Sequence, residues 1–186
     1  MRPLFSVVVI ARNEQSTLPR LVKSLDEFLK RGGEFIVLDT GSTDKTADIA
    51  RSLGCAVIEV GDKFRIKISD EQVDAINDKF VVDGEENVVN YGDSLFDYAS
   101  ARNYAVSFAT NDWVWQPDCD EIFTKFNIEE IEKAISEEGV TGLSYDFVFS
   151  HDENNNPLIQ FLHSKMYKRS VYEWRGIIHE VLQLKQ

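Results

Sequence analysis

The first sixty residues alternate between short apolar runs and segments with helical spacing. The runs at 5–11, 34–39 and 55–60 are rich in Val, Ile, Leu and Phe, which predicts strands buried on both faces. Apolar residues recur at helical spacing from Leu18 to Leu29, and 41–54 predicts a second helix that ends at Gly54. This order predicts a parallel sheet whose ligands gather at the carboxyl ends of the strands.

The alternation stops between residues 59 and 93. Ten acidic and four basic residues give this segment a net charge of −6, half of the total for the chain. Turn-forming residues are frequent within it, so we predict a solvated insertion over 61–93 with a hairpin around Asp83-Gly84. The acids do not follow the ligand spacing of an EF-hand, which favours a charged surface over a calcium loop.

The second half of the chain returns to regular patterns. We predict a helix over 95–109, a strand over 112–116 and a short helix that begins with a capping box at Asn127 and Glu130. Two antiparallel strands follow, over 140–150 and 157–169, separated by the turn HDENNNP. The predicted fold class is therefore α/β, with a mostly parallel central sheet flanked by helices and a small antiparallel C-terminal part.

Composition excludes several classes of function. Twenty basic and thirty-two acidic residues give a net charge of −12, which argues against binding nucleic acid or an anionic membrane through bulk charge. Cys55 and Cys119 provide neither a disulfide framework nor zinc-binding spacing. The apolar start LFSVVVIA is too short to span a bilayer, and no other run reaches that length. We expect no transmembrane segment and a cytoplasmic location.

The hexapeptide QPDCDE places carboxylates directly after a strand that reads as buried. Pro117 favours the end of the strand, and Asp118 and Asp120 would point the same way in extended chain. They could share one Mg²⁺ or Mn²⁺, which prefers oxygen ligands and often binds through one or two carboxylates and substrate phosphates. Acids cluster in ordinary turns as well, but the position after a fourth strand favours the metal.

Asp39 ends the second predicted strand, just before the sequence GSTD. It could cap the next helix, a role that Ser42 and Asp44 could also fill. A carboxylate at a strand end can also accept a hydrogen bond from the imide N–H of uracil or from a ribose hydroxyl. The residues alone favour neither interpretation.

Four segments, in order, carry a resemblance to a known family. They are SVVVIARNEQSTLPRLVKSL, FIVLDTGSTDKTADIARSLG, YASARNYAVSFATNDWVWQPDCDEIF and WRGIIHE. Together they resemble a family 2 glycosyltransferase with the GT-A fold, and more narrowly the bacterial subgroup related to lipopolysaccharide-core sugar transferases. The resemblance covers most of the chain except 61–93. It implies one catalytic domain over 1–186, with a nucleotide-binding half (1–115) and a metal and acceptor half (116–186).

The resemblance also implies roles for individual residues. The donor nucleotide would be held by Ala11, Arg12, Asn13, Glu14, Asp39, Arg102 and Cys119. Asp118 and Asp120 would be the metal-binding pair for Mn²⁺ or Mg²⁺, with His179 as a further metal ligand or a phosphate contact. Glu180 is the first candidate for the base that activates the acceptor, and Glu121 is the second. Either could instead orient a metal ligand.

The activity implied is metal-dependent, inverting transfer of a sugar from a nucleotide sugar, with a UDP-sugar expected. The acceptor would be a glycan or another lipid-linked or protein-linked glycoconjugate. Trp174 could stack on a sugar, whereas Trp113 and Trp115 read as core; Lys165, Lys168 and Arg169 could assist phosphate binding or lie on a solvated strand face.

Two other functions stay open. A nucleotidyltransferase would make nucleotide sugars on a related sheet, but ARNE lacks the glycine-rich, lysine-bearing loop that grips a triphosphate. The second is a non-catalytic domain that binds a nucleotide sugar. The presence of Asp118, Asp120 and Glu180 argues against it. The chain stops six residues after Glu180, so we expect that it could be part of a longer multidomain protein.

Overall fold

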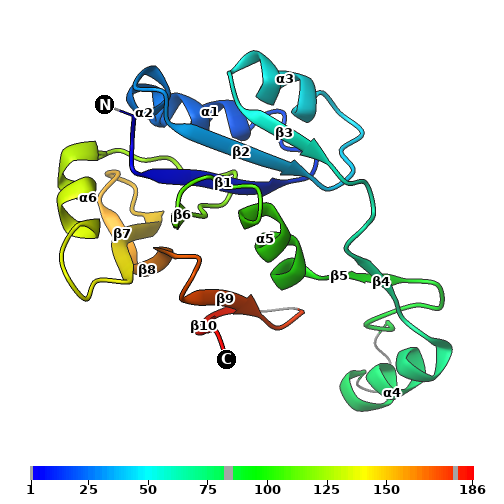
Figure 1. The fold of residues 1–186 in the computed structure, drawn as a ribbon. Helices are drawn as coiled ribbons and strands as arrows, with labels where there is room; N and C mark the ends of the chain where they lie inside the picture. The colour runs from blue at the N-terminus through cyan, green and yellow to red at the C-terminus, as the bar shows by residue number, and fades with distance from the viewer. Residues whose placement is uncertain (1, 82–85, 178–179) are drawn as a thin grey trace.

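The computed structural model describes residues 2–81, 86–177 and 180–186. It contains a six-stranded sheet in the order β3-β2-β1-β6-β8-β7 (Figure 1). The strands are β1 (Phe5–Ala11), β2 (Glu34–Asp39), β3 (Ala56–Glu59), β6 (Trp113–Trp115), β7 (Gly142–His151) and β8 (Pro157–Lys168). β1, β2, β3 and β6 pair in parallel, and β8 pairs antiparallel with both β6 and β7. The predicted fold class is confirmed.

Helices cover both faces of this sheet. They are α1 (Leu18–Ser24), α2 (Asp26–Lys30), α3 (Thr46–Ser52), α5 (Tyr98–Val106) and α6 (Ile128–Ile135). Side chains alternate across β1, so Val7 and Val9 enter one core with α1, α2, α3 and α6, whereas Val8 enters a second core. α5 closes this second core together with the ribbon of β9 (Tyr172–Arg175) and β10 (Val181–Leu184).

Two predicted helix boundaries are wrong. The segment 18–29 was expected to form one helix, but Leu25 has φ −110° and ψ 21° and separates α1 from α2. The helix expected over 95–109 begins at Tyr98, because the Asp97 side chain accepts from the Ser100 amide and caps its N-terminus. The residues before it form β5 (Ser94–Phe96), which pairs antiparallel with β4 (Arg65–Lys67).

The acidic insertion is more ordered than its composition suggests. It contains α4 (Asp70–Phe80), which begins with a reciprocal capping box between Ser69 and Gln72, a signal that the sequence analysis overlooked. α4 lies beyond the β4–β5 ribbon, away from the main sheet (Figure 1). The hairpin predicted around Asp83-Gly84 lies outside the described residues.

The β7–β8 hairpin reaches past the carboxyl end of the parallel strands. β6 pairs only with Met166–Lys168, so the earlier part of β8 and the part of β7 that pairs with it continue beyond Trp115. The hairpin therefore projects on the side of the sheet where ligands of parallel strands gather. Within the described residues, no helix has the length and apolar character needed to cross a bilayer.

Candidate active site

Asp39 ends β2 in a buried position at the carboxyl edge of the sheet. Its Oδ1 accepts hydrogen bonds from the amides of Gly41 (2.9 Å) and Ser42 (2.8 Å), which closes the turn after the strand. Its Oδ2 is also buried, but it has no hydrogen-bond partner among the described residues. The helix-capping interpretation of Asp39 is wrong, because the Asp44 carboxylate bonds to the Thr46 amide (2.9 Å) at the start of α3. Asp39 thus keeps one acceptor for another group.

The turn after β1 is tied to the turn after β2. Asn13 has φ +58°; its amide donates to the Ser42 hydroxyl (2.9 Å), and its Oδ1 accepts from the Thr43 amide (2.8 Å). The Arg12 guanidinium donates to the Thr40 carbonyl (2.7 Å), and the same nitrogen bonds to the Asp62 carboxylate (2.8 Å). These contacts fix the two predicted nucleotide-binding turns to each other.

Ala11 and Gly41 complete this connection through the backbone. The Ala11 carbonyl accepts from the Thr40 amide (2.9 Å), and its side chain is buried in the core. Gly41 has φ +93°, and a Cβ there would lie 3.3 Å from the Arg12 guanidinium. Glycine is required at this position by its backbone conformation.

A cleft of about 420 Å³ lies at the carboxyl end of the parallel strands. Its lining residues are Ile10, Glu14, Thr17, Tyr98, Arg102, Asp118, Cys119 and Asp120. Five of the residues assigned by resemblance to donor or metal binding therefore meet here, from three separate parts of the chain. Their roles stay predictions.

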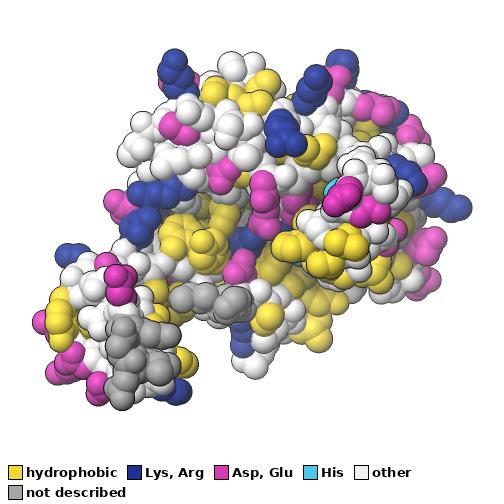
Figure 2. Space-filling model, turned by 180° about the vertical axis from the view of Figure 1, so that it is seen from behind, with side chains coloured by type: hydrophobic (Ala, Val, Ile, Leu, Met, Phe, Trp, Pro, Cys, Tyr) yellow, Lys and Arg dark blue, Asp and Glu magenta, His cyan; other side chains and the backbone are white. Residues whose placement is uncertain are grey.

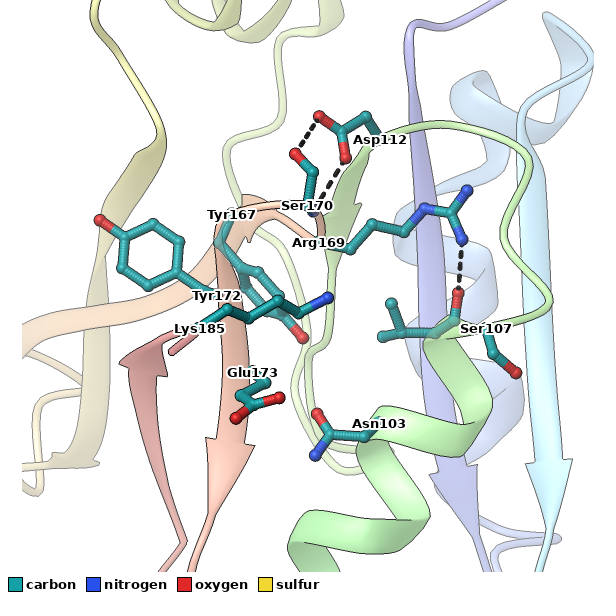
Figure 3. Close-up of a pocket in the computed structure, with 10 residues that line it drawn as sticks. Asn103, Ser107, Asp112, Tyr167, Arg169, Ser170, Tyr172, Glu173 and Lys185 are labelled. Atoms are coloured by element: carbon teal, nitrogen blue, oxygen red, sulfur yellow. Dashed lines mark hydrogen bonds between the residues drawn. The ribbon is translucent and has the colours of Figure 1, made fainter.

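A second cleft of about 400 Å³ lies at the opposite edge, next to the start of β6 (Figure 3). The polar side chains at its rim are largely bonded to protein: Asp112 accepts from the amide (3.0 Å) and hydroxyl (2.7 Å) of Ser170. Arg169, considered above for phosphate binding, lies here and donates to the Val106 carbonyl (3.4 Å). It is on the wrong edge of the sheet for the phosphates of a donor in the first cleft.

Asp118 and Asp120, the predicted metal-binding pair, lie in a turn and not in extended chain. The Glu121 amide donates to the Asp118 carbonyl (3.1 Å), and the Glu121 carboxylate accepts from the Asp118 amide (2.9 Å). The prediction that Asp118 and Asp120 point the same way because of strand alternation is wrong. The turn brings both of them to the cleft instead.

Two buried cations hold the carboxylates of this turn. Arg102 bonds to Asp118 through Nη2 (2.6 Å) and to Glu180 through Nε (2.8 Å), and its side chain is only 6% exposed. The Lys165 ammonium contacts the other oxygen of Asp118 and lies 3.0 Å from Glu121 Oε1. Burial disfavours a charged Asp118, but the positive charges of Arg102 and Lys165 outweigh it and hold the pKa of the carboxyl below its ordinary value.

Glu121 supports the turn and is poorly placed to act as a base. It is buried; Oε1 accepts from Lys165 and from the Asp118 amide, and Oε2 accepts from the Tyr145 hydroxyl (2.8 Å). Burial, followed by the charge of Glu121, raises the pKa of Tyr145 above its ordinary value, so this hydroxyl stays a donor. Both oxygens are thus committed to protein partners.

Two further residues, Trp174 and Lys165, lie in surroundings that the sequence did not predict. Trp174 is buried, and its indole donates to the buried Gln116 Oε1 (2.6 Å), so it belongs to the core and not to a sugar platform. Trp113 and Trp115 are buried, as predicted. Lys165 is also buried, which excludes a solvated strand face. The only sequence feature that indicated this burial is the position of Lys165 as a single cation inside the mostly apolar run FLHSKMY.

The predicted set of metal ligands lies only partly within the described residues. His179 lies outside the described residues, and among those described no group of three or more His, Cys, Asp or Glu side chains is arranged to hold a metal ion. Asp118 and Asp120 nevertheless fit an ion of the Mg²⁺ type, which is bound by one or two protein carboxylates and by substrate phosphates. Each carboxylate oxygen retains a second lone pair after one hydrogen bond.

The two cysteines are expected to be unreactive in the folded protein. Burial raises the pKa of the Cys55 thiol to about 12, and burial together with nearby carboxylates raises that of Cys119 further. With the aromatic disulfide reagent DTNB at pH 8, we expect neither thiol to react within minutes and both to react after unfolding in guanidinium. Rapid labelling of one thiol in the native protein would show that its surroundings are open.

Comparison with known proteins gives one family match. The model of the family described as glycosyl transferase family 2 matches residues 6–67 and 69–182. A 4,4'-diaponeurosporenoate glycosyltransferase of Staphylococcus haemolyticus is 49% identical over 55 residues, which are 30% of this chain and 14% of that protein. An uncharacterized glycosyltransferase of Rickettsia bellii is 27% identical over 127 residues, 68% of this chain and 31% of that protein. The chain thus spans less than a third of these relatives.

Solved structures show a more distant similarity. S. aureus TarS 1-349 is 21% identical with a TM-score of 0.49, over 84% of this chain and 38% of that one. Glucosyl-3-phosphoglycerate synthase from Mycobacterium tuberculosis, in complex with UDP, glucosyl-3-phosphoglycerate and Mn²⁺, is 23% identical with a TM-score of 0.45, over 75% of this chain and 42% of that one.

Proposed function

Because the chain belongs to glycosyl transferase family 2, we propose that it transfers a sugar from a nucleotide-sugar donor to a hydroxyl of a glycan or glycoconjugate acceptor. The observation that carries this proposal is the cleft in which Glu14, Arg102, Asp118, Cys119 and Asp120 meet. Residues 1–115 would hold the nucleotide, and residues 116–186 would provide the metal and acceptor side. The lipopolysaccharide-core subgroup stays a prediction.

Asp39 is the residue that we assign to the nucleoside of a UDP-sugar. Its buried Oδ2 has no partner among the described residues, and an unsatisfied buried acceptor costs about 1–3 kcal/mol. The uracil imide or a ribose hydroxyl would supply the missing donor. Its other oxygen already bonds to two amides, which holds the carboxylate in place for this contact.

Replacement of Asp39 by asparagine is expected to weaken UDP binding by about 10- to 100-fold. The amide group would present N–H where the donor's N–H or O–H needs an acceptor, whereas the side-chain oxygen could still close the turn. Isothermal titration calorimetry with UDP measures the effect. Asp48→Asn, at an exposed position on α3, is the matched control; equal UDP affinity of Asp39→Asn and the wild type would remove Asp39 from the site.

Arg102 is the residue that we assign to the diphosphate. Its Nη1 is buried and unpartnered among the described residues, while Nη2 and Nε bond to Asp118 and Glu180. A guanidinium held in this way has one nitrogen left to donate to a phosphate oxygen of the donor. It would therefore orient the donor as well as attract it.

The charge balance of the acid cluster supports a divalent ion. Four carboxylates (Asp118, Asp120, Glu121 and Glu180) face two cations (Arg102 and Lys165), which leaves a formal charge of −2 before a diphosphate enters. We propose that Asp118 and Asp120 hold Mn²⁺ or Mg²⁺ together with the donor. When bound, the ion would neutralise charge on the departing diphosphate.

Glu180 is the better candidate for the base. Its Oε1 bonds to Arg102, which fixes the carboxylate beside the cluster, and its side chain is 15% exposed. Glu121 has both oxygens committed, so it is assigned to support of the turn. In inverting transfer, the base takes the proton of the acceptor hydroxyl on the face opposite the leaving group. Inversion is an expectation from the family resemblance.

A donor panel tests the function directly. Calorimetry with uridine, guanosine and cytidine diphosphates, with and without Mn²⁺, is expected to give strongest binding for UDP with Mn²⁺. Mass spectrometry then follows sugar transfer from UDP-sugars to a panel of acceptors. Pyrophosphate release from a nucleoside triphosphate and a sugar phosphate would indicate a nucleotidyltransferase, and donor binding without hydrolysis or transfer would indicate a binding domain.

A further inference from the structure

One face of the projecting part of the β7–β8 hairpin carries exposed apolar side chains. Ile159 and Phe161 are 48% and 45% exposed, and alternation along β8 places them on the same face, with Phe147 opposite Phe161. Leu162 points to the other face, where the exposed Asp146 lies opposite it. The face of Ile159 and Phe161 carries no Asp, Glu, Lys or Arg along 147–150 and 157–163. Grouped exposed apolar residues of this kind mark a binding surface in a soluble protein.

Aromatic rings connect this surface to the acid turn. Phe161 lies 5.3 Å from Phe147, Phe147 lies 5.0 Å from His163, and His163 lies 5.7 Å from Tyr145, measured between ring centroids. The Tyr145 hydroxyl then bonds to Glu121, which closes the turn that carries Asp118 and Asp120. The apolar surface is therefore continuous with the candidate active site.

The position of the hairpin fits the acceptor side of the cleft. It extends past the carboxyl end of β6, where the cleft lies. Figure 2 shows hydrophobic side chains on both sides of a hollow in which acidic and basic side chains gather. An acceptor that approaches the donor along the hairpin would meet uncharged, apolar surface before it reaches the carboxylates.

We propose that this hairpin surface, formed by Phe147, Ile159 and Phe161, binds an amphiphilic acceptor. The acceptor's hydroxyl group enters the cleft, and its uncharged hydrocarbon or aryl part lies on the hairpin. This inference rests on the proposed function, because it names the class of acceptor for the same site. The absence of charge on the surface favours an uncharged group, and burial of apolar area supplies the attraction.

Two other occupants fit the surface less well. A lipid bilayer would meet the tip of the hairpin first, and the tip is the polar sequence HDENNN in a chain with net charge −12. A second copy of the chain would pair along the edge strand β7, but the register of β7 and β8 shifts at three places. Such irregularities interrupt edge-to-edge pairing.

Octyl and methyl β-glycosides of the same sugars test the proposal. With the donor identified in the panel, we expect kcat/KM for the octyl acceptor to exceed that for the methyl acceptor by at least about tenfold, which corresponds to about 1.4 kcal/mol. The double variant Ile159→Gln/Phe161→Gln, which changes two residues on the same face, should lose this preference and keep its affinity for UDP. Phe80→Gln, also at an exposed apolar position but on α4, should keep both.

A binding measurement keeps the test independent of turnover. Calorimetry with octyl β-glucoside below its micellar concentration should show binding to the wild type and at least about tenfold weaker binding to the double variant. Equal use of octyl and methyl acceptors, an octyl preference that survives in the variant, or a dimer that the variant dissociates would overturn the proposal. If the wild type does not bind UDP, the proposed function is contradicted. The binding of octyl glucoside would still test the hairpin proposal separately.

Discussion

Replacement of Asp120 by asparagine is expected to reduce sugar transfer by about 100- to 1000-fold while the fold is retained. Asp120 lines the cleft, and no ion pair to it occurs among the described residues. Removal of its charge therefore leaves no buried cation without a partner, but it removes a ligand from the proposed metal site. The measurement is kcat with saturating donor over a series of Mn²⁺ concentrations, alongside a thermal melt.

The control for Asp120→Asn is Asp78→Asn, which removes the same charge from an exposed position on α4. This variant is expected to transfer sugar at the wild-type rate. If the two variants behaved alike, or if Asp120→Asn kept the wild-type dependence on Mn²⁺, the assignment of the metal site to this turn would be wrong.

Replacement of Lys165 by methionine is expected to lower the free energy of unfolding by about 3–5 kcal/mol. The ammonium contacts both Asp118 and Glu121, so its loss removes a cation that two carboxylates of the turn share. Arg102 still pairs with Asp118, but the buried Glu121 keeps no positive partner among the described residues. Urea denaturation, with the slope held common between variants, measures the change.

Two variants separate the charge effect from packing. Lys168→Met removes a cation three residues away, which lies over the Trp113 ring at 5.5 Å, and should change stability by about 1 kcal/mol or less. Lys165→Met/Glu121→Gln should recover part of the lost stability, because it also removes the buried charge that lacks a partner. A loss in Lys165→Met no larger than in Lys168→Met would show that the ammonium does not hold the turn.

The parallel half of the fold could be predicted because its signals are local. Buried parallel strands are continuous apolar runs, and 5–11 and 34–39 match β1 and β2. Helix boundaries were less predictable where a single residue decides them, as Leu25 and Asp97 do. In the acidic insertion, the high content of acidic and turn-forming residues led to a prediction without α4. The capping box of Ser69 and Gln72 would have indicated the start of this helix.

The sequence predicted which types of residue form the candidate site, but it did not predict the contacts between them. The acids were recognisable from spacing and resemblance, but the turn that orients them depends on Glu121 folding back onto the Asp118 amide. Lys165 lies 47 residues from Asp118, and only the antiparallel pairing of β8 with β6 brings it beneath the turn. Such non-local partners leave little trace in one sequence.

The role of Asp39 also could not be decided from the local sequence. The sequence allowed a helix cap or a nucleoside contact, and nothing local separates the two. In the structure the Asp39 carboxylate bonds to the amides of Gly41 and Ser42 and not to α3, and it retains one buried acceptor without a described partner. The nucleoside contact stays a prediction. Burial of a specific atom is a property of the whole fold.

A crystal structure with UDP and Mn²⁺, with the metal located by its anomalous scattering, is the most direct test of the central claim. The account predicts the uracil or ribose against Asp39 and one Mn²⁺ between the diphosphate and the carboxylates of Asp118 and Asp120. A nucleotide bound away from this cleft, or a metal ion bound without either aspartate, would contradict it.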